Sequence, residues 1–142
     1  MKKYLFLILM VVAHFANGQS SMLEQYRWEN RIVLIFGSRA VASVEKQIAE
    51  LKSAPEGISD RDLLIFHIEQ EVHLLNGKSS QALAPAQRFR DKYNVPEDEF
   101  RYILLGKDGG VKYNKKDFVS NETLFSIIDA MPMRKREMRE EE

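Results

Sequence analysis

The sequence predicts a mixed α/β domain in which a four-stranded sheet carries helices on both faces. Two nearly continuous apolar runs, at 31–36 and 62–68, are typical of strands buried on both faces, as in parallel pairing. Between them, segment 40–53 has apolar residues three and four positions apart, which indicates an amphipathic helix. An Asp-Gly pair at 108–109 separates two further strand-like segments, and this pair is a strong signal for a β-hairpin.

The first 18 residues have the layout of a secretory signal peptide. Two lysines precede a ten-residue apolar run at 4–13, which is shorter than the roughly 20 residues of a membrane span. We expect cleavage after Gly18, so that the mature chain starts at Gln19. The protein is then periplasmic or secreted, with no membrane association after cleavage.

The composition limits the partners and the kinds of catalysis that this protein can have. The chain beyond residue 18 has the length of one ordinary domain, and it carries 19 basic and 21 acidic residues, which gives no electrostatic case for a nucleic-acid partner. No cysteine is present. Thiol catalysis, iron–sulfur ligation and cysteine-bound zinc are therefore excluded. The absence of disulfides is notable for an exported protein, because disulfides form in oxidising compartments.

The remaining elements follow in order. The first strand leads into a loop with Gly37, Ser38 and Arg39, and the helix at 40–53 ends in a turn at 54–57. A polar connector at 76–80 precedes a helix with Pro85 in its first turn. The last expected elements are a third strand at 100–105, an antiparallel fourth strand from Val111, and a helix capped by Ser120 and interrupted at Pro132.

The resulting order, β-α-β-α-β-β-α, is that of a thioredoxin-like core. We place this domain at 19–131 and a charged C-terminal tail at 132–142.

Two groups of residues could carry chemistry. The segment HIEQEVH would bring His67, Glu69, Glu71 and His73 to one face if the strand continued, as weak candidates for a metal site. The alternative is that the strand ends near Ile68 and a solvated loop follows. Ser38 and Ser43 lack a motif that supplies a base and an oxyanion site, so no catalytic residue is predicted.

We expect a ligand or protein partner to contact five other residues. The candidates combine the single tryptophan with cations that suit an anionic ligand: Trp28, Arg39, Lys107, Arg134 and Arg136. A basic tail can equally be a helix held to the domain by ion pairs. A convergence of the cations near the Gly37–Ala40 loop would favour a ligand, and dispersal into ion pairs would favour a structural role.

Several segments together resemble one family. They are YRWENR before IVLIF, Arg61-Asp62 before LLIF, the hairpin LLGKDGGVK, and the closing IDAMPMRKREMR. They resemble a thioredoxin-like domain of unknown function that occurs in exported bacterial proteins and in vertebrate sushi-repeat and related extracellular-matrix proteins. Residues at positions that match its boxes are Lys107, Asp108, Gly109, Gly110, Met131, Pro132, Arg134, Arg136 and Met138. The resemblance implies a peroxiredoxin-related fold without redox cysteines.

The function expected from these observations is binding without catalysis. The partner would be an unknown protein or a small anionic ligand, with no cofactor. One alternative is a cysteine-free enzyme, with or without metal assistance through His67 or His73, and another is a structural or matrix component.

Overall fold

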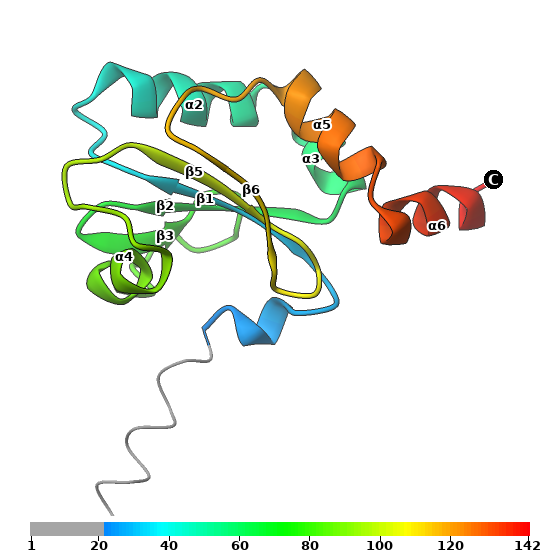
Figure 1. Cartoon of the computed structure of the whole chain (residues 1–142), viewed down its shortest axis with the longest axis horizontal. Helices are drawn as coiled ribbons and strands as arrows, with labels where there is room; N and C mark the ends of the chain where they lie inside the picture. Colours follow the sequence, from blue (N-terminus) through cyan, green and yellow to red (C-terminus); the bar gives the residue numbers. More distant parts are fainter. Residues whose placement is uncertain (1–21) are drawn as a thin grey trace, which may run out of the picture.

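The computed structural model describes residues 22–142 (Figure 1). The expected signal peptide at 1–18 and the expected first mature residue, Gln19, lie outside this range. Among the described residues, no helix has the length and apolar character needed to cross a bilayer.

The strands form one six-stranded sheet in the order β4-β3-β2-β1-β5-β6. Only β1 and β2 are parallel, and every other neighbouring pair is antiparallel. In chain order the strands are β1 (Arg31–Phe36), β2 (Leu63–Ile68), β3 (Glu71–Leu74), β4 (Ala84–Pro85), β5 (Arg101–Leu105) and β6 (Val111–Lys115). The predicted βαβ unit and the β5–β6 hairpin are present.

The expectation of four strands was wrong, because the chain turns back after β2. Glu69 and Gln70 make a two-residue turn, and β3 then runs antiparallel to β2 with His73 opposite His67. β3 is short and polar on one face, and β4 is an edge strand of two residues that ends in Pro85. A proline is tolerated at an edge, where its missing N–H is not needed. Neither strand has the long apolar run that predicted β1 and β2.

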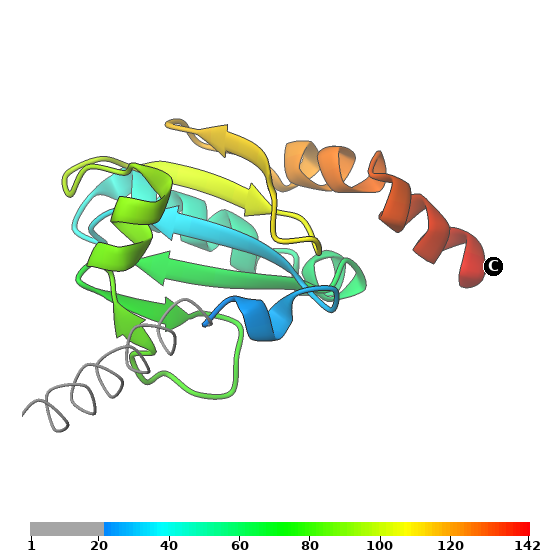
Figure 2. The same cartoon turned by 60° about the horizontal axis from the view of Figure 1, so that its bottom comes forward.

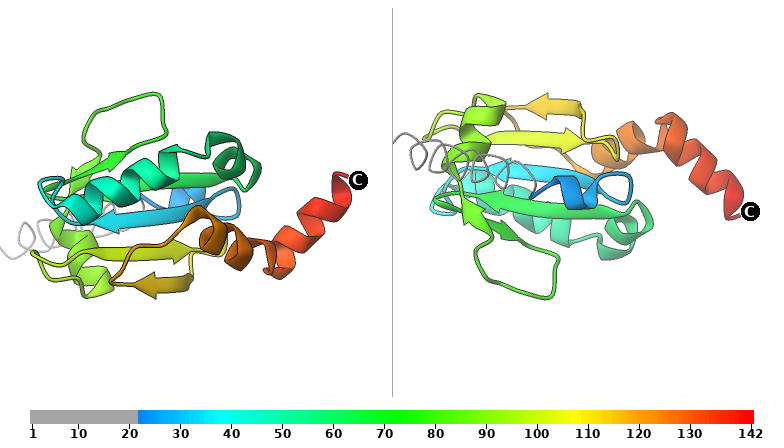
Figure 3. Two further views of the ribbon diagram at one scale, coloured as in Figure 1. Left: turned by 90° about the horizontal axis from the view of Figure 1, so that it is seen from above. Right: turned by 90° about the horizontal axis from the view of Figure 1, so that it is seen from below.

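Helices cover both faces of the sheet (Figures 1 and 3). On one face lie α2 (Ala42–Lys52), α3 (Pro55–Asp60) and α5 (Asn121–Asp129), and on the other lie the 3₁₀ helix η1 (Glu24–Tyr26) and α4 (Gln87–Tyr93). Pro55 begins α3 where a turn was expected, and Pro85 precedes α4 rather than lying in its first turn. From α5, helix α6 (Pro132–Glu140) continues and projects beyond the end of the sheet (Figure 2).

The central strand β1 has a buried side chain at every position. Because side chains alternate along a strand, Val33 and Ile35 join the core under α2 and α5, whereas Leu34 and Phe36 join the core under α4. Gln47 on α2 extends the first core by bonding both the N–H and the carbonyl of Val119, at 2.7 and 2.8 Å. Ser120 caps α5 as predicted, since its Oγ accepts from the Thr123 N–H at 3.1 Å.

Candidate functional site

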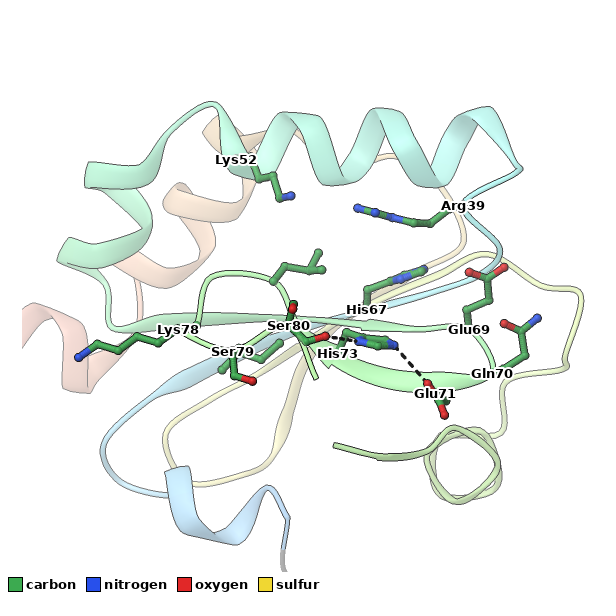
Figure 4. Close-up of a pocket in the computed structure, with 13 residues that line it drawn as sticks. Arg39, Lys52, His67, Glu69, Gln70, Glu71, His73, Lys78, Ser79 and Ser80 are labelled. Atoms are coloured by element: carbon green, nitrogen blue, oxygen red, sulfur yellow. Dashed lines mark hydrogen bonds and ion pairs between the residues drawn. The ribbon is translucent and has the colours of Figure 1, made fainter. Parts of the chain in front are cut away.

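A groove of about 790 Å³ runs along β2 and β3, from the turn after the carboxyl end of β2 to the connector that follows β3 (Figure 4). Arg39 and Lys52 border it on the side of α2, while His67 and His73 lie on the strands below them. The connector between β3 and β4 loops outward at this edge of the sheet and forms the other wall (Figure 3). The lining residues that matter here are Arg39, Lys52, His67, Glu69, Glu71, His73, Lys78, Ser79 and Ser80.

The loop after β1 is fixed to β2 through Gly37. Its N–H donates to the Ile68 carbonyl at 3.0 Å, and its own carbonyl lies 2.7 Å from Nε2 of His67. The φ of Gly37 is +132°, a conformation that residues with a side chain rarely adopt. A Cβ there would lie 2.8 Å from Cγ2 of Val44. A glycine is therefore required at this position.

Glu69 holds the same loop from the turn between β2 and β3. The hydroxyl of Ser38 and the backbone N–H of Arg39 donate to its carboxylate, and together they lower the pKa of Glu69. The backbone of this turn is secured in its own right, because the buried guanidinium of Arg90 donates to the Glu69 carbonyl at 3.2 Å. One wall of the groove is thus held in place before any ligand binds.

The two histidines lie opposite each other on neighbouring strands and have different surroundings. His67 is only 3% exposed, and burial lowers its pKa, so the ring is neutral near pH 7. His73 lies nearer the open edge, with Nδ1 3.3 Å from the Ser80 carbonyl and Nε2 3.6 Å from the Glu71 carboxylate. No set of three or more histidine or carboxylate side chains within 22–142 is placed to hold a metal ion. The metal hypothesis assumed one continued strand, whereas the chain turns at 69–70 and this turn places His73 opposite His67.

The cations of the groove are only partly paired. Arg39 pairs with Glu45 through Nε at 3.0 Å, and both side chains are about half-exposed, so water or a ligand can still reach the guanidinium. Lys52 and Lys78 have no ion-pair partner among residues 22–142. The groove can therefore offer several N–H donors to an anion. Sequence reasoning missed both lysines, since nothing in the sequence places 76–80 beside α2 when β3 is not recognised.

The predicted cation Lys107 lies at the other end of β1, in a cluster of ion pairs. Its ammonium contacts Asp62 at 2.8 Å and Glu137 at 2.7 Å. Glu137 also accepts two hydrogen bonds, at 3.1 and 3.2 Å, from Arg31, which is 1% exposed. Burial opposes the charge on Lys107, but the bonds to Asp62 and Glu137 outweigh it and raise the pKa of Lys107.

Arg134 extends this cluster to α3 and α5. Its guanidinium donates to the Asp60 carboxylate and, at 3.3 Å, to Asp129. Asp129 is also paired with Arg61 at 2.7 Å, and Arg61 in turn lies over the ring of Phe125. We call these residues the basal network: Arg31, Asp60, Arg61, Asp62, Lys107, Asp129, Arg134 and Glu137. Through it, α6 is attached to the domain, and the expected boundary at residue 131 falls inside this attached region.

The remaining candidates, Trp28 and Arg136, are exposed at the basal end. Trp28 is 62% exposed with a φ of +70°, and its backbone N–H donates to the Lys107 carbonyl at 2.6 Å. The six residues of β1 separate this end from the loop that carries Arg39, a span of roughly 17 Å. The predicted cations therefore do not converge on one site. Only Arg39 borders the groove, while Lys107 and Arg134 are taken up by ion pairs.

Comparison with known families decides the classification. Residues 22–137 match the sequence profile of a family described as a domain of unknown function, DUF4174. The chain belongs to this family. The match extends well into α6, in keeping with the place of that helix in the basal network. No curated protein matches the chain.

Solved structures show the fold of this DUF4174 domain to be thioredoxin-like. A reduced 2-Cys peroxiredoxin from Plasmodium vivax aligns with a TM-score of 0.59 at 13% identity, covering 80% of this chain and 72% of the peroxiredoxin. Thioredoxin peroxidase I from Plasmodium yoelii gives 0.56 at 14% identity, with 80% and 79% covered. A thioredoxin-fold protein from Helicobacter pylori gives 0.50 at 14% identity, with 77% and 73% covered. These likenesses concern the fold alone.

Proposed function

We propose that this protein is an exported, non-catalytic binding domain that holds a small anionic ligand in the groove beside β2 and β3. The observation that carries the proposal is the set of cations without full pairing around this groove, Arg39, Lys52 and Lys78. An ion pair with a ligand is favoured where protein carboxylates do not already occupy the cation.

The position of the groove also supports a binding role. In open α/β sheets, ligands bind beyond the carboxyl ends of parallel strands, and here Arg39 and Glu69, which follow the carboxyl ends of β1 and β2, line one end of the groove. Two carboxylates line it as well, but Glu69 is bonded to Ser38 and to the Arg39 N–H, and Glu71 lies beside His73. The cations thus have fewer internal partners than the carboxylates do.

Two observations favour binding over catalysis. The chain has no cysteine, so the thiol chemistry of redox-active thioredoxin folds has no nucleophile here. In the described part of the chain, no serine hydroxyl is hydrogen-bonded to a histidine ring nitrogen, and Ser38 instead contacts Glu69 and the Ala40 N–H. A serine without a bonded base is a weak nucleophile.

Sulfate is a suitable first probe, because its charge does not vary at ordinary pH. We expect a titration of the ¹⁵N-labelled protein with sodium sulfate to shift the amide signals of Gly37–Ala40 and of residues near Lys52 and Lys78, with sodium chloride at equal ionic strength as the reference. The double variant Arg39→Gln/Lys52→Gln should bind at least tenfold more weakly. The matched control is Arg136→Gln, which removes an exposed cation at the basal end and should leave the affinity unchanged. Shifts confined to the basal end, or none beyond those of chloride, would refute the proposal.

Export is tested separately. N-terminal sequencing of the protein produced in a bacterial host should give Gln19 as the first residue. A protein that retains Met1 and stays in the cytoplasm would contradict this part of the proposal.

A further inference from the structure

His67 has one ring nitrogen engaged by the fold and one open to the groove. Nε2 lies 2.7 Å from the Gly37 carbonyl, and because a carbonyl can only accept, Nε2 carries a proton whether the ring is neutral or charged. Nδ1 makes no hydrogen bond and is not among the buried unpartnered polar atoms of the described chain, although the residue lines the groove. A neutral ring therefore presents a lone pair at Nδ1 to the groove.

Burial and the nearby cation Arg39 oppose the protonation of this ring. Burial has the largest effect in lowering the pKa of His67, and Arg39, from the β1 loop, and His73, on β3, lower it further. Glu69, from the turn, acts against them, as does the Gly37 carbonyl. The other charged groups that border the groove are Lys52 on α2, Lys78 on the connector and Glu71 beside His73.

We propose that an oxyanion in the groove takes up a proton from solvent onto Nδ1 of His67, so that ligand binding and protonation are coupled. This inference rests on the proposed function. Burial and Arg39 disfavour the imidazolium form of His67. A bound anion beside the ring stabilises that positive charge and so favours protonation. The new N–H bond at Nδ1 then donates to an oxygen of the anion, and the bond from Nε2 to Gly37 stays intact. Protonation thus adds a donor without breaking a contact of the fold.

The same geometry defines the class of ligand. Arg39 offers its two terminal nitrogens, and Figure 4 shows its side chain above His67 on the α2 side of the groove. A group with two or more acceptor oxygens on one atom, such as a carboxylate, phosphate or sulfate, can accept from Arg39 and from protonated Nδ1 together. A cationic ligand would instead keep His67 neutral.

The experiment measures sulfate affinity and proton uptake in the same protein. We expect the affinity to rise by up to tenfold for each unit that the pH falls between about 7.5 and 5.5, since one proton is linked to binding. Calorimetry in two buffers of different ionisation enthalpy should show an uptake approaching one proton per sulfate bound. In ¹⁵N-detected imidazole spectra, saturating sulfate should raise the pKa of His67 and move the Nδ1 signal to that of a protonated nitrogen.

Two variants separate the possible outcomes. His67→Gln keeps a donor for the Gly37 carbonyl and should bind sulfate with little pH dependence, whereas His73→Gln should retain the dependence. Sulfate binding to the wild-type protein that is independent of pH, with the pKa of His67 unmoved, would overturn the coupling and leave the proposed function standing. If sulfate does not bind at any pH, both proposals fail.

Discussion

At the amino end of β1, Arg31 is buried against Glu137 with two hydrogen bonds. Arg39, in the loop after β1, is about half-exposed and lines the groove together with Lys52 and Lys78, which lack ion pairs within 22–142. Both ends are rich in cations. They differ in what faces them, because α6 brings Glu137 to two cations of the basal end, whereas within 22–142 Arg39 has an exposed ion pair with Glu45 and Lys52 and Lys78 have none. The comparison indicates that the basal cations are satisfied by the fold and that those of the groove are available to a ligand.

The largest expected effect comes from breaking the basal network. Glu137→Ala should lower the free energy of unfolding by about 3–5 kcal/mol, because it leaves Arg31 buried without a counter-charge. Urea unfolding followed by circular dichroism measures the change. In the double variant Arg31→Met/Glu137→Leu, much of the loss should be recovered, since neither charge then remains buried. A loss below about 1 kcal/mol for Glu137→Ala would mean that α6 is a solvated tail after all.

As the pH falls, the basal network and His67 in the groove should lose their contributions to folding stability over different pH ranges. Hydrogen bonds from arginine and lysine outweigh burial and lower the pKa of Asp129 and Glu137 in the folded state. The unfolded chain therefore takes up protons first as the pH falls, and stability is lost below about pH 5, by roughly 1.5–3 kcal/mol for each charged hydrogen bond that fails. The pKa of His67 is also lowered in the folded state, so its contribution to stability is lost earlier, as the pH falls below about 6.5.

Urea midpoints between pH 8 and 3 separate these two windows. Glu137→Gln should flatten the lower part of the profile and leave the upper part as it is, while His67→Gln should do the reverse. A single transition that both variants alter equally would show that the two ends titrate as one unit.

At the groove end, the backbone at Gly37 is expected to matter more than the charges. Gly37→Ala should cost about 1–3 kcal/mol, because alanine does not favour a φ of +132° and its Cβ would contact Val44. Urea unfolding measures this cost. Gly110→Ala is a matched control with an ordinary φ and should cost less. Equal costs would indicate that the β1 loop adapts and does not form a fixed wall.

The sequence predicted those features of the fold that depend on local residue patterns. The strands β1 and β2 were predictable because every side chain of β1, and nearly every one of β2, is buried, so that apolar runs result. The hairpin at Asp108-Gly109 was predictable because its turn demands particular residues, and Gly109 indeed has a φ of +80°. Local chemistry determines both features.

The groove and the basal network depend instead on contacts between distant segments. Arg31 and Glu137 are 106 positions apart, and no local pattern connects them. β3 was missed because only one of its four residues, Val72, is fully buried, which leaves a weak periodicity. Without β3, His73 and Lys78 could not be placed in the same groove as Arg39, so the sequence left open whether the predicted cations converge on one site or are dispersed into ion pairs.

The smallest expected change in stability comes from a substitution in the groove. Arg39→Gln should alter the free energy of unfolding by no more than about 0.5 kcal/mol, because the pair with Glu45 is about half-exposed and such pairs contribute little. The same substitution at Arg134, which is 3% exposed and bonded to Asp60 and Asp129, should cost several times more and leave sulfate affinity unchanged. Arg39→Gln should do the opposite and weaken sulfate binding at least several-fold. An arginine that only stabilises the fold should not affect the affinity for sulfate. If both variants change stability and affinity together, the division between a closed basal end and an open groove is therefore wrong.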